Sequence, residues 1–111
     1  MLYTVILDYD HHPFSFIVKD VQRLIKRYRL KSAKIYVSSK RDKPYHYHVY
    51  FERKVHSIDD FREIISNSNC CENYKEYAQT YPFTIIRIRG TKPKPYLYAV
   101  VYQKKVEKKR N

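Results

Sequence analysis

Glycine is nearly absent from this sequence, since Gly90 is the single one among 111 residues. Phosphate-binding loops of the Walker and Rossmann types need several glycines, because the backbone must come close to the phosphates and a Cβ atom would obstruct it. The sequence contains no such loop. This excludes P-loop NTPases and Rossmann-type enzymes as function classes.

Long apolar runs and spaced cysteines are also missing. The sequence contains no run of about 20 apolar residues, the length that a membrane-spanning helix needs. Its first ten residues, MLYTVILDYD, lack the features of a signal peptide. We therefore expect a soluble, cytoplasmic protein without a membrane partner. The two cysteines, Cys70 and Cys71, are adjacent, a spacing that suits neither an ordinary disulfide nor a four-ligand zinc site. We expect two free thiols in a loop.

Acidic residues are few compared with basic ones. Eleven Asp and Glu stand against 23 Lys and Arg, which gives a formal net charge of +12 at pH 7. Such a charge favours a polyanionic partner. Because 43% of the residues are hydrophobic and 16% aromatic, the chain can also form a core. We expect residues 1–111 to form one domain, with a basic C-terminal tail from about 106 to 111.

Hydrophobic periodicity predicts the order of helices and strands. β-Branched and aromatic runs predict strands, and apolar stripes at helical spacing predict helices. The strands are expected at 2–9, 33–39, 45–52 and 83–89, and the helices at about 17–28 and 57–66. The order βαββαβ predicts a ferredoxin-like α+β fold, with helices on one face of an antiparallel sheet and the active site on the open face. Residues 74–79 suit a short helical turn, and the segment 96–106 suits either a helix or a strand.

The strand YHYHVYFE, at 45–52, carries the most informative pattern. Because strand side chains alternate between faces, His46 and His48 share one face with Tyr50 and Glu52, opposite an apolar face. Two histidines at this spacing can ligate one divalent metal ion through neutral imidazoles. The alternative is that both are polar residues on a solvated strand.

The segment PYHYHVYF, at 44–51, resembles the His-hydrophobe-His strand of the HUH endonuclease superfamily, whose small Rep proteins from viruses and plasmids initiate rolling-circle replication. Two further segments follow the family's order. LYTVILDYD, at 2–10, is similar to the family's first strand, and Tyr102 and Lys105 form a Tyr-x-x-Lys motif. The resemblance implies a metal-dependent nickase and strand transferase that acts on single-stranded DNA at a replication origin.

The resemblance also implies roles for single residues. His46 and His48 would hold Mg²⁺ or Mn²⁺, which would polarise the scissile phosphate. Tyr102 would attack and leave a 5′-phosphotyrosyl enzyme, which stores the phosphodiester energy for rejoining. If the last segment is a helix, Lys105 lies one turn beyond Tyr102 and could stabilise the phosphate or the phenolate. Tyr98 is the second choice for the nucleophile.

Two assignments stay open at this point. Tyr96 is a third candidate for the nucleophile. HUH sites commonly add an acidic or polar third ligand, because hard cations prefer oxygen ligands. The candidates for this ligand are Asp8, Asp42 and Glu52.

Basic and aromatic side chains are expected to border the open face and to hold a single DNA strand. Cations neutralise phosphates, and each tyrosine that stacks on a base contributes about 1 to 3 kcal/mol. The expected DNA-binding residues are Lys34, Tyr36, Lys40, Arg41, Lys43, Arg87 and Arg89.

Two other functions fit the same sequence. A non-catalytic, RRM-like protein would bind single-stranded nucleic acid through Tyr36, Tyr50 and the basic residues without a metal, although no RNP-type run is present. A small HUH transposase would share the nicking chemistry and act as a dimer. A homodimer and contacts with host or viral replication proteins therefore stay open as partners.

Overall fold

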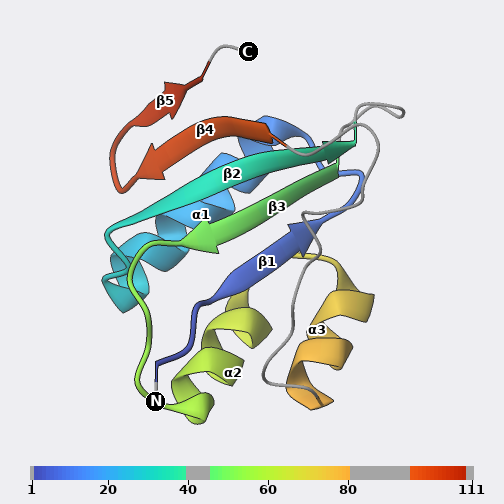
Figure 1. The fold of residues 1–111 in the computed structure, drawn as a ribbon, viewed down its shortest axis with the longest axis vertical. Helices are drawn as coiled ribbons and strands as arrows, with labels where there is room; N and C mark the ends of the chain where they lie inside the picture. Colours follow the sequence, from blue (N-terminus) through green and yellow to red (C-terminus); the bar gives the residue numbers. More distant parts are fainter. Residues whose placement is uncertain (1, 40–45, 81–95, 110–111) are drawn as a thin grey trace.

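The computed structural model describes residues 2–39, 46–80 and 96–109. In chain order they form β1 (Ile6–Tyr9), α1 (Phe14–Tyr28), β2 (Ser32–Ser39), β3 (His46–Phe51), α2 (Ile58–Asn67), α3 (Glu72–Thr80), β4 (Tyr96–Tyr102) and β5 (Val106–Lys108). The strands form one antiparallel sheet in the order β1-β3-β2-β4-β5 (Figure 1). The predicted α+β class is confirmed.

The order of the described elements, βαββααββ, is not the predicted ferredoxin-like order βαββαβ. One difference is α3, which is a nine-residue helix where a short turn was expected. Tyr74 and Ala78 lie four residues apart on this helix and both are buried. Residues at this spacing share a helix face, so packing against the rest of the protein stabilises a segment whose remaining residues are mostly polar.

The second difference is the C-terminal segment, which forms two strands joined by a turn and no helix. Ala99 and Val101 of β4 alternate into the core, as a strand requires. The chain then turns back, and β5 pairs with β4 in antiparallel register. The expected strand at 83–89 lies outside the described residues, as does the hairpin connection at 40–44.

Helix α1 covers one face of the sheet. Of the five residues of the predicted apolar stripe, Ile17, Val21, Leu24 and Ile25 are buried and Tyr28 is half-buried. In Figure 1 this helix lies behind β2, β3 and β4. Each large apolar side chain that is removed from water in this way stabilises the fold by about 1.5 to 3 kcal/mol.

Helix α2 begins where the sequence predicts. The Ser57 hydroxyl accepts a hydrogen bond from the backbone N–H of Asp60 at 3.1 Å and so caps the helix. Phe61, Ile64 and Ile65 are buried on its inner side. Figure 1 shows α2 and α3 next to β1, at the bottom of the view. Among the described helices, none is long and apolar enough to span a membrane.

A buried carboxylate joins α1 to β1 and to the segment that precedes α3. Asp20 of α1 is 4% exposed. Its Oδ2 accepts hydrogen bonds from the Tyr9 hydroxyl at 2.6 Å and the Asn69 backbone N–H at 2.8 Å. Its Oδ1 accepts from Arg23 at 2.7 Å and from the Asn69 side chain at 2.9 Å. Burial raises the pKa of Asp20, but these hydrogen bonds outweigh it and hold the pKa below its ordinary value of 3.8.

We predict that Asp20→Asn lowers the free energy of unfolding by about 2 to 4 kcal/mol at neutral pH, because it leaves buried donors without a charged acceptor. The folded-state pKa of Asp20 lies below its unfolded value. Its contribution is therefore present above the unfolded pKa and is lost as the pH falls through the folded pKa. Urea denaturation at neutral pH and at about pH 3 measures both effects.

Glu63→Gln, an exposed change on α2, is the control for this experiment. It should unfold like the wild type at both pH values. The Asp20→Asn variant should lose less stability between neutral and acidic pH than the wild type does. Equal losses in the two proteins would contradict the role assigned to Asp20.

Candidate functional site

The side chains of β3 alternate between the two faces of the sheet, as the sequence pattern predicts. The apolar side chains of this strand are buried in the core against α1. The other face of β3 carries His46 and His48. In the sheet register His48 lies between Asp8 of β1 and Tyr36 of β2. The two histidines thus share their face with residues from both neighbouring strands.

Two carboxylates at the end of β1 contact the two histidines. Asp10 Oδ1 lies 2.6 Å from Nδ1 of His46, which is hydrogen-bonding distance. Asp8 Oδ1 lies 3.6 Å from Nε2 of His48. The sequence Asp-Tyr-Asp places both carboxylates on the same side of the strand, because side chains two residues apart point the same way. We call Asp8, Asp10, His46 and His48 the Asp–His cluster.

The other two expected third ligands are not part of this cluster. Glu52 lies at the far end of β3, where it accepts a hydrogen bond from the Ser32 hydroxyl at 2.9 Å. It also pairs with Lys31 at 4.0 Å. Asp42 lies outside the described residues. Of the three candidates, the structure brings Asp8 to the histidines.

Burial shifts the protonation of the Asp–His cluster. Burial, followed by the charge of Asp10, raises the pKa of Asp8 to about 7, although His46 opposes the shift. Burial likewise lowers the pKa of His48 to about 4. Asp8 Oδ1 and His48 Nδ1 are buried without a hydrogen bond. A cation would favour the ionised carboxylate and the neutral imidazole, which are the forms that metal ligands take.

The donor set of the cluster fits a divalent cation. Within 2–39, 46–80 and 96–109, no three His, Cys, Asp or Glu side chains already surround one point as ligands. The carboxylates contact the imidazoles instead. The Asp10 contact favours the proton on Nδ1 of His46, which makes Nε2 the atom that can ligate. A carboxylate oxygen of Asp8 and imidazole nitrogens of His46 and His48 would then be the ligands, with Asp10 orienting His46.

Asp10 is the residue of this cluster that the sequence reasoning missed. The first strand was expected to end at Tyr9, one residue before Asp10. The signal that could have found it is the alternation of Asp8 and Asp10 across Tyr9, which continues the pattern of the strand.

The structure does not bring Tyr98 or Tyr96 to the Asp–His cluster. The Tyr98 ring centroid lies 5.1 Å from that of Phe14 and 5.8 Å from that of Tyr47. Tyr47 points into the core, away from the histidine face. Tyr96 also packs against the core. Both tyrosines therefore lie on the helix side of the sheet.

Tyr102 lies on β4, in register with Ser32. This position is four residues along β2 from Tyr36, the cross-strand neighbour of His48, a separation of about 13 Å along the strand. Lys105 does contact Tyr102, but across a turn and not along a helix. The Tyr102 N–H donates to the Lys105 carbonyl at 2.8 Å, and Lys105 Nζ lies 4.8 Å from the ring centroid.

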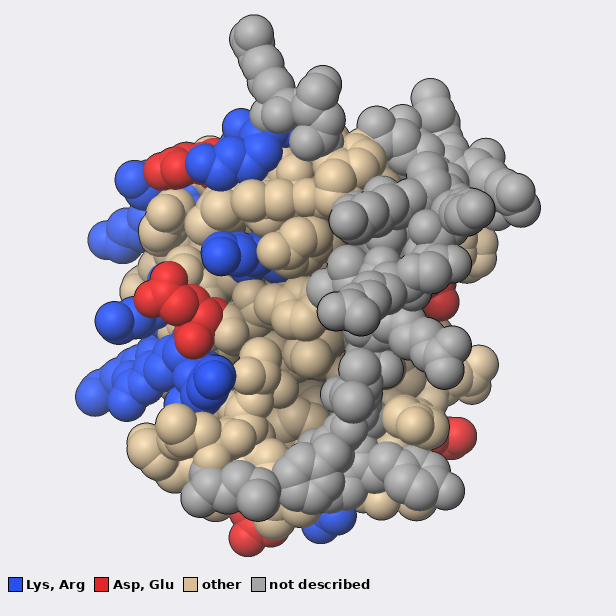
Figure 2. Space-filling model, viewed as in Figure 1, with Lys and Arg blue, Asp and Glu red and all other residues tan. Residues whose placement is uncertain are grey.

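The expected DNA-binding residues are described in part. Lys34 is exposed and lies in register with Tyr50, and the rings of Tyr36 and Tyr50 meet edge to face at 5.5 Å. Burial raises the pKa of Tyr50 to about 12, with the charge of Tyr36 contributing. Figure 2 shows Lys and Arg side chains along the left edge of this view, where β2 begins and β3 ends in Figure 1. The remaining five, Lys40, Arg41, Lys43, Arg87 and Arg89, lie outside the described residues.

The comparisons with known proteins find no match to this chain among protein families, curated sequences or solved structures. The functional interpretation therefore rests on the geometry of the site and on the sequence pattern of β3.

We predict that Mn²⁺ raises the Tm of the wild-type protein and does not raise that of His48→Ala or Asp8→Asn. A ligand that binds the folded state alone stabilises it by about 2.7 kcal/mol at 100 times its Kd. Differential scanning fluorimetry with and without Mn²⁺ measures the effect. His56→Ala, which removes an exposed histidine outside the cluster, should keep the full response.

Asp8→Asn should also melt above the wild type when no metal is added, at about pH 8. The pKa of Asp8 is raised in the folded state, so ionising this carboxyl costs stability as the pH rises from 3.8 through about 7. The amide avoids this cost, and a gain of about 1 to 3 kcal/mol is expected. A variant that is stable yet unresponsive to Mn²⁺ separates metal binding from folding, whereas a full Mn²⁺ response would remove Asp8 from the site.

Proposed function

We propose that the protein is a metal-dependent endonuclease that nicks single-stranded DNA and transfers the cut strand, as HUH initiators of rolling-circle replication do. The observation that carries the proposal is the approach of Asp8 to His48 and of Asp10 to His46 on one face of an antiparallel sheet. The resemblance of the His46–His48 strand to the HUH motif and the net charge of +12 support it.

The order of the first elements also supports the proposal. β1, α1, β2, β3 and α2 follow the first five elements of the ferredoxin-like plan. The proposed fold is therefore a ferredoxin-like core with an added helix and a C-terminal hairpin. In this proposal the face opposite α1 is the one that meets DNA, and the replication origin and replication proteins are the partners.

In the proposed mechanism, Mg²⁺ or Mn²⁺ bound by Asp8, His46 and His48 would offset the charge that develops on the phosphate oxygens. Asp10 accepts the hydrogen bond of His46 Nδ1 and so holds the imidazole in one orientation. A tyrosine oxygen forms a bond to phosphorus while the P–O3′ bond breaks. The phenol proton passes to solvent, and the released 3′ oxygen takes up a proton.

Two arguments favour different tyrosines as the nucleophile. The Tyr-x-x-Lys motif favours Tyr102, whose ring contacts Lys105, with Tyr98 as the second choice. The sheet register favours Tyr36, because it is the cross-strand neighbour of His48. Cross-strand side chains have Cβ atoms about 4.5 to 5.5 Å apart, close enough to act on the same phosphate.

To test the function, the protein is incubated with a labelled single-stranded oligonucleotide library and Mn²⁺ or Mg²⁺, and the products are separated on denaturing gels. We expect a covalent protein–DNA adduct that depends on the metal. His48→Ala and Asp8→Asn should lower its yield by at least about 100-fold, and Asp10→Asn by about 10- to 100-fold. His56→Ala should leave the yield unchanged.

Single Tyr→Phe changes at 36, 98 and 102 identify the nucleophile, because phenylalanine keeps the ring and removes the attacking oxygen. The change that abolishes the adduct while DNA binding persists names the residue. Tight, salt-dependent DNA binding without cleavage or adduct under either metal would overturn the nuclease.

That last outcome would favour the RRM-like alternative, in which the Tyr36–Tyr50 pair stacks on bases and Lys34 contacts phosphates. A homodimer that joins two DNA ends after cleavage would instead favour the transposase alternative.

A further inference from the structure

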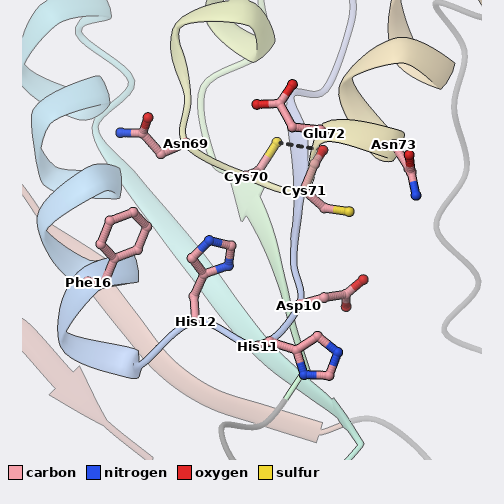
Figure 3. Close-up of a pocket in the computed structure, with 9 residues that line it drawn as sticks. All are labelled: Asp10, His11, His12, Phe16, Asn69, Cys70, Cys71, Glu72 and Asn73. Carbon is pink, nitrogen blue, oxygen red and sulfur yellow. Dashed lines mark hydrogen bonds between the residues drawn. The ribbon is translucent and has the colours of Figure 1, made fainter.

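A pocket of about 600 Å³ lies beside the Asp–His cluster, between the turn that follows β1 and the start of α3. Its size is within the range of small-ligand sites in proteins. Figure 3 shows His12 between Phe16 of α1 and the Asp10–His11 pair, with Cys70 and Cys71 facing it from the other side. We call this cavity the β1–α3 pocket.

The β1–α3 pocket shares a wall with the proposed metal centre. Asp10 lines the pocket and also binds His46 at 2.6 Å. The His11 ring, which lines the pocket as well, meets the His46 ring edge to face at 4.9 Å between centroids. A ligand in the pocket would therefore lie against Asp10 and His11, the two residues that contact His46.

Two stacked aromatic rings line the pocket, and one of them carries a buried nitrogen without a hydrogen-bond partner. The rings of His12 and Phe16 are stacked, with centroids 4.9 Å apart and planes 14° apart, and Tyr9 packs edge-on against His12 at 5.7 Å. Phe16 remains 39% exposed. Nδ1 of His12 is buried and makes no hydrogen bond. These are features of a site for a planar, hydrogen-bonding group.

The charges of the lining distinguish a base from a phosphate. Nine of the described residues line the pocket; they include the carboxylates of Asp10 and Glu72, and no lysine or arginine is among these nine. A phosphate would be repelled there. A neutral base with an exocyclic amine would donate hydrogen bonds to carboxylate or amide oxygens, as cytosine and adenine do to acidic and amide side chains.

The far wall of the pocket is fixed before any ligand binds. Asn69 is bound to the buried Asp20 through both its backbone and its side chain. The Cys71 backbone N–H donates to the Asp8 carbonyl at 2.8 Å, which ties the same segment to β1. A site held in this way binds without a large ordering cost.

From these observations we infer that the β1–α3 pocket binds one nucleobase of the DNA strand, a base with an exocyclic amine, next to the scissile phosphate. The inference rests on the proposed nuclease function and gives it a sequence preference. Stacking on the Phe16–His12 pair supplies affinity, and the acidic lining selects against thymine.

Two measurements test the pocket. In the adduct assay, oligonucleotides that differ at each base flanking the cut should show one position where adenine or cytosine is preferred over thymine by about ten-fold. Phe16→Ala should weaken DNA binding by about five- to 100-fold and abolish this preference. Lys19→Ala, an exposed change one turn along α1, should change neither.

The second measurement reads binding without cleavage. Oligonucleotides with 2-aminopurine at successive positions are titrated with the protein, and stacking quenches the fluorescence of the base in the pocket. Quenching at one position, lost in Phe16→Ala and His12→Ala, supports the pocket even if no adduct forms and the nuclease is rejected. An adduct without base preference or position-specific quenching overturns the pocket alone.

Discussion

The arrangement of the site depends on the hydrogen bonds that the buried carboxylate of Asp20 accepts. This carboxylate is inside the protein, and its four hydrogen bonds come from β1, α1 and the segment before α3. Asn69 is 49 residues from Asp20 in the sequence. The apolar core alone would let its segment slide against α1, because hydrophobic contacts have little directionality. The network holds Asn69 against α1, two residues before Cys71, whose backbone N–H donates to the Asp8 carbonyl of β1. It thereby sets both the wall of the β1–α3 pocket and the position from which Asp8 and Asp10 extend.

The burial that would suit the Asp–His cluster to bind a metal ion lowers the stability of the metal-free protein. Asp8 is driven towards its protonated form and His48 towards its neutral form by burial. A buried carboxyl group with a pKa near neutrality costs the metal-free protein stability, and proteins keep such groups mainly where the site needs them. The proposed cation, if bound, would offset this cost. In a chain with a net charge of +12, Asp8 and Asp10 place two carboxyl groups beside the face that is proposed to hold DNA. A cation there would reduce their repulsion of the phosphates as well as assist the proposed cleavage.

Local patterns in the sequence predicted those elements whose burial follows one regular period. The stripe of α1, the Ser57 cap of α2 and the two faces of β3 are of this kind. The hydrophobic residues of 96–106 do not alternate regularly, because the pairing of β2 and β4 shifts between Ile35 and Tyr36. Tyr98 is left without a partner residue on β2 in this register. The contact of Asp10 with His46 joins residues 36 apart in sequence. The alternation of Asp8 and Asp10 could place both on one face, but it could not show that Asp10 meets His46. Asp8 could be named as a candidate ligand, but the choice among three required the register of β1 with β3.

The strand conformation of β4 changes what its tyrosines can do. On a helix Tyr98 and Tyr102 would share a face, but on this strand Tyr98 packs against Phe14 on the helix side of the sheet. Attack on a phosphate requires the reacting atoms to approach to about 3 to 3.5 Å. A phosphate at His48 is within reach of a side chain in the same cross-strand row, which is that of Tyr36, whereas Tyr102 lies about 13 Å further along the sheet. If the protein is the proposed nuclease, this sheet geometry favours a nucleophile on β2. Tyr102 would reach a phosphate at His48 only if the strand or the DNA shifted by about 13 Å.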